Sequence, residues 1–509
     1  MKKLNNKIIF GFISFFYLIG NFVWWKINTP IIPMDVSALH FCDVFQNQYL
    51  YFNAPLLTWI MKGIFFLFGK EYFDLEITTV NYFFFLTALY FIYKIGVELK
   101  DKETGNIAMI LFGLTPAVYG LSRQYGHQDW HVMVAMVANI YCLIKLNFFK
   151  NRKWSILYGI TVGLGLLIKD EFLPYFFTPW LYVVIKSLAE KIEIKKVINI
   201  LITIAVGSLI AGCHYFRYEI IYKIFNEPVF ATKSVFSLES LKVLTFGLSN
   251  EILSPIIFIL VLFGIFWFLK YYKSQNKYIF VLWIVVPWLI IMFMPHHKLA
   301  EYGVPFVPAL ILLVSLFVSE LKYKNILLTV ITVVCIVQYI IFSYAAGIDK
   351  TSNNMYFNKY NLVYYDKDKA KLVINLVDYI DENLKGYNIL FEDLPYFDPI
   401  DRYSIISCLL LKNISFAIDD ALTETRTEKF DIIVFVGKYR TVEERVSEAI
   451  DLFEYPEKNY DYVYNSINDY FVERQKKINE KFYVSDEFYL DKSNKEEVKV
   501  VILKNKDLV

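Results

Sequence analysis

Charged and polar side chains that could carry out chemistry gather in four short clusters between the apolar stretches of this chain. The clusters are Asp35, the segment from Arg123 to Asp129, Lys169-Asp170-Glu171 and His296-His297-Lys298. A carboxylate in such a position could take a proton from a hydroxyl group, and an Arg or Lys side chain could bind a phosphate. Because charged groups at the ends of apolar helices are costly to desolvate, their repeated occurrence indicates a site rather than a packing accident.

Each carboxylate also has a purely structural interpretation. Asp35 is followed by residues compatible with a helix, so it could cap a helix N-terminus instead of acting as a general base. Asp129 precedes an apolar run, and a negative charge near a helix N-terminus is favoured electrostatically on its own account. The residues alone leave both alternatives open.

The basic residues have two interpretations as well. Arg123 could bind a phosphate through two hydrogen bonds, or extend to the lipid headgroups. Lys169 could contact a phosphate, or be neutralised by the neighbouring Asp170 and Glu171. His297 belongs with Lys298 to a basic cluster that lipid headgroups would also attract.

Two histidines have a spacing that could bind a metal on one helical face. His127 and His131 are four residues apart, but no third ligand follows nearby in the sequence, which favours histidines at the membrane interface. The sequence contains no Walker-type phosphate loop, no HExxH zinc helix and no GxSxG nucleophile elbow.

The composition requires that membrane helices position these clusters. Of the 509 residues, 56% are hydrophobic, and the mean hydropathy is +0.40. Runs of about 18 or more apolar residues are long enough to span a bilayer. The sequence predicts eleven such helices, at about 8–25, 78–97, 106–121, 131–148, 155–168, 172–185, 197–213, 252–269, 278–294, 302–318 and 326–344. A further stretch, 55–68, is short and amphipathic, which is typical of an interfacial helix.

Small residues mark where two of the predicted spans approach each other. Gly159 and Gly163 are four residues apart in one span, and Gly207 and Ala211 have the same spacing in another. Such small-residue faces allow helix backbones to pack closely in a membrane.

Lysine and arginine residues indicate the orientation of the chain. They precede the first span and then recur in alternate loops, which the positive-inside rule makes cytoplasmic. This places the N-terminus inside the cell, the C-terminus outside, and all four polar clusters on the outer face of the plasma membrane. A formal net charge of +2 argues against nucleic acid as a partner.

The composition changes near Ala345. We expect residues 1–345 to form the membrane domain, including an outer loop at 28–77 that contains the interfacial helix. Residues 346–509 are richer in charge, and short β-rich runs at 387–391, 431–436 and 498–503 alternate with helical patterns at 368–384 and 442–453. The predicted fold class is therefore a polytopic α-helical membrane protein with a C-terminal extracytoplasmic α/β domain.

The order of the motifs along the chain is more specific than any one cluster. Asp35 and a Pro55-Leu56 interfacial helix come first, followed by Leu114-Thr115-Pro116, Ser122-Arg123, Asp129, the Gly163 to Lys169 segment, and then Lys298, Tyr302, Pro305 and Pro308. This order resembles the polyprenyl-phosphate-dependent glycosyltransferases of the GT-C fold. Among these, it is most similar to the protein O-mannosyltransferases and the bacterial aminoarabinose transferase of lipid A. The resemblance covers about residues 1–320.

The resemblance implies an enzyme that moves a sugar from a polyprenyl-phosphate donor to a glycan, lipid or protein acceptor by one inverting displacement. It implies Asp35 as the general base and Asp129 as the second acidic residue. Candidates for binding the leaving phosphate are Arg123, Lys169 and Lys298; further site candidates are Asn53, Asp170, Glu171, His297 and Tyr302.

Two departures from the family pattern bear on a metal. Many relatives have an Asp-Glu pair in the first loop, where this chain has Asp35-Val36. The lipid A enzymes have an acidic residue and a lysine before the interfacial proline, where this chain has Asn53 and Ala54. A metal requirement therefore does not carry over, and a divalent metal cofactor stays an open question.

The competing class is a transporter or flippase for a lipid-linked or small polar substrate. Transporters tend to place ionisable residues near the middle of the membrane in broken helices. The predicted spans are almost free of charge at their centres, and the polar clusters lie at one set of helix ends. This arrangement favours chemistry at the outer surface.

Overall fold

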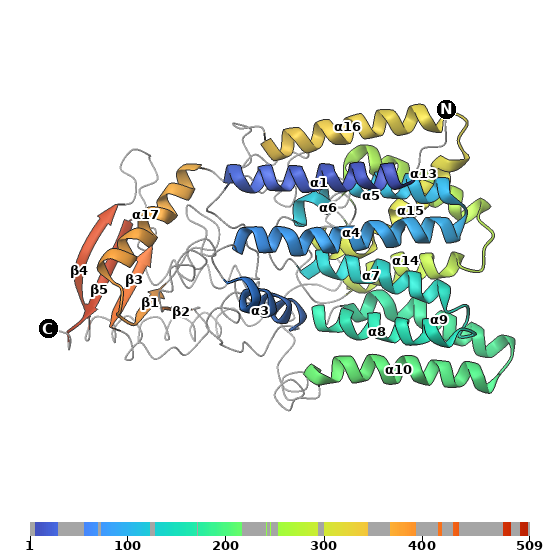
Figure 1. The fold of residues 1–509 in the computed structure, drawn as a ribbon, viewed down its shortest axis with the longest axis horizontal. Helices are drawn as coiled ribbons and strands as arrows, with labels where there is room; N and C mark the ends of the chain where they lie inside the picture. Colours follow the sequence, from blue (N-terminus) through green and yellow to red (C-terminus); the bar gives the residue numbers. More distant parts are fainter. Residues whose placement is uncertain are drawn as a thin grey trace.

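The computed structural model describes residues 6–28, 55–69, 73–122, 128–169, 172–215, 241, 245, 253–293, 300–344, 367–392, 416–419, 431–436, 482–489 and 499–506. Figure 1 shows long helices lying side by side in a bundle, with a sheet and one helix beyond the end of the bundle opposite the N-terminus. Helices α1, α4, α7, α8 and α10 contact one another in that order across the bundle.

Every predicted span overlaps one or two helices of the structure. The helices of the bundle are α1 (Asn6–Asn28), α3 (Leu56–Phe68), α4 (Phe73–Leu99), α5 (Lys102–Gly113), α6 (Pro116–Leu121), α7 (Gln128–Lys145), α8 (Arg152–Ile168), α9 (Leu173–Glu190), α10 (Ile194–Tyr215), α13 (Pro255–Tyr271), α14 (Lys277–Phe293), the 3-10 helix η3 (Ala300–Phe306), α15 (Val307–Glu320) and α16 (Lys324–Tyr344). Among the described residues, four stretches have both the length and the apolar composition to cross a membrane: Asn6–Val23, Thr79–Leu99, Ile194–Tyr215 and Tyr302–Glu320. The number of eleven spans stays a prediction.

Two predicted spans are not continuous α-helices. The run at 106–121 is divided into α5 and α6, because Pro116 has no backbone N–H and forces the preceding Thr115 into an extended conformation. The run at 302–318 begins as η3, which contains Pro305, and becomes an α-helix only at Val307. In both cases the apolar run is helical as predicted, but a proline interrupts the α-helix within it.

Helix α15 lies at the centre of the bundle. It is buried along nearly its whole length and packs against α5 and α13. Since lipid tails are as apolar as leucine, close packing rather than escape from water holds such helices together.

The predicted small-residue faces form the contact between α8 and α10. A Cβ atom on Gly159 would lie 2.8 Å from the Thr203 carbonyl oxygen, and one on Gly163 would lie 2.6 Å from the Ile210 Cβ. Glycine is therefore required at both positions for this approach of the two backbones.

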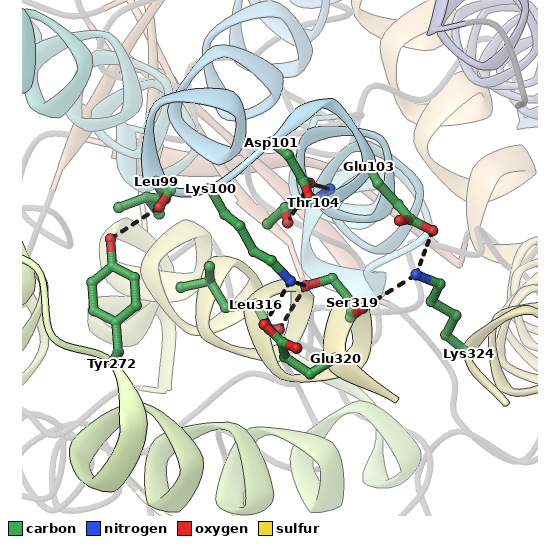
Figure 2. A network of polar contacts seen from close by, with 10 residues as sticks. All are labelled: Leu99, Lys100, Asp101, Glu103, Thr104, Tyr272, Leu316, Ser319, Glu320 and Lys324. Carbon is green, nitrogen blue, oxygen red and sulfur yellow. Dashed lines mark hydrogen bonds and ion pairs between the residues drawn. The ribbon is translucent and has the colours of Figure 1, made fainter. Parts of the chain in front are cut away.

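A polar network ties several helices together at the N-terminal end of the bundle (Figure 2). The Lys100 ammonium donates to the Ser319 hydroxyl at 2.7 Å and pairs with Glu320 at 2.8 Å. Lys324 pairs with Glu103 at 2.8 Å and donates to the Ser319 carbonyl at 3.2 Å. These contacts join the turn between α4 and α5 to the end of α15 and the start of α16.

Beyond the opposite end of the bundle, α17 (Lys367–Asn383) lies beside a mixed five-stranded sheet (Figure 1). The strands are β1 (Ile389–Glu392), β2 (Phe416–Asp419), β3 (Ile432–Val436), β4 (Phe482–Tyr489) and β5 (Lys499–Asn505), in the order β2-β1-β3-β5-β4. Strand β1 is parallel to β2 and β3, whereas β5 is antiparallel to β3 and β4. The predicted runs at 387–391, 431–436 and 498–503 overlap β1, β3 and β5, and the predicted helix at 368–384 overlaps α17. The predicted helix at 442–453 lies outside the described residues.

Candidate active site

Asp129 lies in the first turn of α7. Its side chain is only 7% exposed, although it carries a charge at the end of an apolar helix. The partial positive charge of the helix N-terminus stabilises the carboxylate there. The position of Asp129 is therefore explained locally, but its burial requires a further positive partner.

Lys169 supplies that partner. It terminates α8, where its backbone turns from helical to extended and its N–H still donates to the Gly165 carbonyl. The change of direction lets the side chain reach α7, so that its ammonium lies 3.2 and 3.3 Å from the two carboxylate oxygens of Asp129. The lysine side chain is 14% exposed, so water screens this ion pair only weakly.

Tyr302 provides a second contact for the Lys169 ammonium. Its ring centroid lies 5.3 Å from the Lys169 ammonium, within the range of a cation–π interaction. The backbone of η3 is held by two side chains of other helices: Tyr175 donates to the Tyr302 carbonyl at 2.8 Å, and Trp283 donates to the Pro305 carbonyl at 3.2 Å. Helices α7, α8, α9 and α14 thus fix one small constellation around Lys169.

A buried ion pair of this kind is not a general device for stability. The free energy needed to remove two charges from water can exceed the free energy gained from their attraction. If one partner is removed, the remaining buried charge strongly destabilises the protein. What the arrangement does provide is a lysine held in a fixed position, from which its N–H groups can meet an anion. The carboxylate can accept hydrogen bonds from the same ligand.

The structure brings together three of the predicted site residues, Asp129, Lys169 and Tyr302, from separate parts of the sequence. The other candidates lie outside the described residues: Asp35, Asn53, Arg123, Asp170, Glu171, His297 and Lys298. One contact fixes the chain next to Arg123, because the Asn81 amide donates to the Ser122 carbonyl at 2.6 Å.

The histidine with metal-type spacing is packed among apolar helices. His131 is 2% exposed, and its ring meets Phe84 edge to face at a centroid distance of 4.6 Å. Its predicted partner His127 is not among the described residues. Within the part of the chain that the structure describes, no group of three or more His, Cys, Asp or Glu side chains could hold a metal ion.

An apolar cavity between α8, α9 and α10 is a feature that the sequence did not predict. Its volume is about 530 Å³. Aromatic side chains of α9, such as Phe176 and Trp180, form one wall, and the small residues Gly207 and Ser208 of α10 form another. Leu166, which also lines it, lies one helical turn before Lys169. The small residues of α10 were the sequence feature that could have indicated this cavity. They predicted close packing of two helices, but small side chains also leave space between helices.

Comparisons with known proteins agree with this architecture. Residues 53–215 match the model of a family described as dolichyl-phosphate-mannose-protein mannosyltransferase. No curated protein sequence matches the chain.

Solved structures show a similar fold at low sequence identity. ArnT from Cupriavidus metallidurans, bound to undecaprenyl phosphate, superposes with a TM-score of 0.59 and 10% identity, over 97% of this chain and 98% of that one. The oligosaccharyltransferase of Archaeoglobus fulgidus in its apo form gives 0.53 and 10%, over 88% and 71%. The predicted resemblance is thereby confirmed: this multi-pass membrane chain has the GT-C fold, and its residues 53–215 carry the sequence pattern of the dolichyl-phosphate-mannose-protein mannosyltransferases.

Proposed function

We propose that this protein is a glycosyltransferase that moves a sugar from a polyprenyl-phosphate donor to an acceptor on the outer face of the membrane. The observation that carries the proposal is the buried Asp129–Lys169 pair beneath Tyr302, one helical turn from a large apolar cavity. A fixed cation next to an apolar space suits a ligand that has an anionic head and a long hydrocarbon tail. The similarity to ArnT, which is known with undecaprenyl phosphate bound, supports the same class of donor.

The chemistry is a single displacement at the anomeric carbon. The acceptor oxygen forms a bond to that carbon while the bond to the donor phosphate oxygen breaks, so the configuration inverts. The acceptor proton passes to Asp35, and polyprenyl phosphate leaves with the bonding electrons. Asp35 has this role by its place in the motif order, since it lies outside the described residues.

Lys169 stabilises the leaving phosphate, because negative charge grows on the phosphate oxygens as the bond breaks. A preorganised cation in a site of low water content is most effective against such developing charge. Asp129 positions the lysine, and Arg123 and Lys298 complete the phosphate site. The apolar cavity between α8, α9 and α10 holds part of the polyprenyl tail.

The domain arrangement follows from the same proposal. Residues 1–345 bind the donor and carry out the transfer, with the N-terminus in the cytoplasm. Residues 346–509 lie outside the plasma membrane, where their helix and sheet contribute to the choice of acceptor.

A donor screen on the purified protein tests the function. Sugar-phosphate polyprenols of different sugars are offered with candidate acceptors, and free polyprenyl phosphate and glycosylated product are measured. We expect turnover with at least one donor and an inverted anomeric configuration in the product. Substrate uptake into proteoliposomes without any turnover would instead support the transporter or flippase alternative.

Asp35→Asn is the matching variant, and it should abolish transfer while the protein remains folded. Asp101→Asn serves as the control, because it removes a carboxylate near the end of the bundle opposite Asp129, and asparagine caps helices as well as aspartate. Wild-type rates in correctly inserted Asp35→Asn protein would refute Asp35 as the base.

A further inference from the structure

A second, polar pocket lies at the end of α7 opposite Asp129. Its volume is about 680 Å³, and it is formed by the ends of α4 and α7, the start of α8, one residue of α9 and the connection between α13 and α14. From Asp129 to Lys145 the axis of α7 rises by about 24 Å, which is comparable to the apolar thickness of a bilayer. The pocket therefore belongs to the other membrane face and is separate from the candidate active site.

The charges around this pocket are mainly positive. Lys145 and Glu98 both line it and form an ion pair at 3.0 Å. Lys150 also lines it, is exposed, and forms no ion pair with any residue that the structure describes. Lys186 lies 5.5 Å from the ring centroid of Phe148, another lining residue. The charged residues that line the pocket are thus two lysines and one glutamate, which favours an anionic ligand.

The wall of the pocket contains an unusual turn. Asn147, Phe148 and Phe149 have positive φ angles of 49°, 52° and 61°, a left-handed conformation that residues other than glycine adopt rarely and almost never three times in succession. Buried side chains enforce it: Ser187 donates to the Phe148 carbonyl at 2.8 Å, and Asn199 donates to the Phe149 carbonyl at 2.7 Å. Strain that neighbouring groups maintain in this way is found most often at ligand sites.

Aromatic side chains indicate where the pocket lies relative to the bilayer. Trp154 lines it, and Tyr182 donates from its hydroxyl to the Gln275 carbonyl at 3.3 Å, next to the lining residue Asn276. Trp and Tyr are enriched at the level of the lipid headgroups. A ligand in this pocket is thus at headgroup depth.

We propose that this pocket binds the phosphate headgroup of an anionic phospholipid from the leaflet opposite the candidate active site. The lysines neutralise the phosphate, and the Asn147 and Asn276 side chains are the uncharged donors beside it. A free phosphate compound has the same chemistry but lacks the acyl chains that would hold it at headgroup depth. The inference does not depend on the glycosyltransferase proposal.

Native mass spectrometry of the detergent-purified, full-length protein tests the proposal, with phosphatidylglycerol and phosphatidylcholine as probes. Lys150→Gln should retain about fivefold less phosphatidylglycerol than the wild type, which is the effect of about one surface lysine. Glu98→Gln should retain more phosphatidylglycerol than the wild type, because it removes the one carboxylate among the residues that line the pocket. Lys322→Gln, an exposed lysine on the same side of the bundle, is the matched control and should behave as the wild type.

Three results would overturn the proposal. Equal losses in Lys150→Gln and Lys322→Gln would show attraction to general surface charge rather than to this pocket. Displacement of phosphatidylglycerol by millimolar inorganic phosphate would identify a soluble phosphate ligand. Equal retention of phosphatidylglycerol and phosphatidylcholine by the wild type would show that the negative charge is not recognised.

Discussion

Lys169 and Asp129 are forty residues apart in the sequence, yet the lysine ammonium lies within 3.3 Å of both carboxylate oxygens. As separate sequence features, the two residues suggested an acidic residue and a phosphate ligand with independent roles. In the structure they form a single unit, because removing either charge leaves the other buried without this compensation. Their contributions to stability and to function therefore have to be measured together.

Lys169→Met is expected to destabilise the protein by about 3–5 kcal/mol, because it leaves the Asp129 charge in a poorly hydrated place. The double variant Lys169→Met with Asp129→Leu should recover most of that loss in thermal unfolding in detergent. Sugar transfer should stay absent in both variants if Lys169 stabilises the leaving phosphate. Recovery of transfer along with stability would mean that the pair is only structural.

The cavity between α8, α9 and α10 predicts a dependence on the length of the donor tail. Ser208→Phe adds bulk to a residue that lines this cavity and should raise KM for long polyprenyl donors more than for short ones, with little change in kcat. Leu209→Phe places the same aromatic side chain on an exposed position of the same helix and serves as the control. Equal effects of Ser208→Phe on long and short donors would place the tail elsewhere.

The positions of the helices could be predicted from the sequence, because a long apolar run in a membrane protein almost always forms a helix. Strands β1 and β3 were predictable for a similar reason: both are short, apolar and buried. Strand β4 was not, since it contains the adjacent acidic residues Asp486 and Glu487, and its register with β5 shifts between Val484 and Asp486. Its place at the sheet edge results from long-range pairing that no local pattern specifies.

The candidate site was predictable only in part. The sequence selected Asp129, Lys169 and Tyr302 as candidates, but not their contact, which depends on the extended backbone that follows α8. Tyr175 was not selected, because a tyrosine within an apolar helix carries no signal until its hydroxyl is seen to hold η3. The cavity was also missed, since the small residues that create it are the same residues that predict close packing.

Because α8 packs closely on α10, adding even one methyl group at a glycine of the contact should lower the stability of the protein. Gly163→Ala places a Cβ atom 2.6 Å from Ile210, so it should destabilise the protein by about 1–3 kcal/mol. Gly11→Ala is the matched control, because no atom lies within 4 Å of its added Cβ, and it should be neutral or slightly stabilising. Thermal unfolding of both variants in the same detergent measures the difference. Equal stability of the two would contradict the contact.

The polar network of Figure 2 predicts a pH dependence through Asp101, which caps α5 by accepting from the Thr104 N–H at 2.8 Å and from its hydroxyl at 2.9 Å. Burial alone would raise the pKa of Asp101, but these hydrogen bonds and the Lys100 charge outweigh it, so the pKa is lowered. The carboxylate therefore stabilises the fold above its unfolded pKa of about 3.9, and this contribution is lost as the pH falls through the lower folded value.

Asp101→Ala should accordingly cost about 1 kcal/mol at pH 7, and less as the pH falls below about 4. Unfolding temperatures of the wild type and the variant, measured from pH 7 to pH 3, give this difference directly. A gap that widens in acid would show that the carboxylate is not the capping group.

Helix α15 runs from η3, beside the candidate active site, to the polar network at the other end of the bundle. Its end is fastened by the contacts of Ser319 and Glu320 with Lys100, and its length is enclosed by neighbouring helices, so it cannot slide or rotate freely. A movement of Tyr302 on binding a ligand must then be taken up within η3, whose 3-10 hydrogen bonds are weaker than those of an α-helix. Within the part of the chain that the structure describes, η3 is thus the segment beside Lys169 that can adjust, and its adjustment works against the hydrogen bonds from Tyr175 and Trp283.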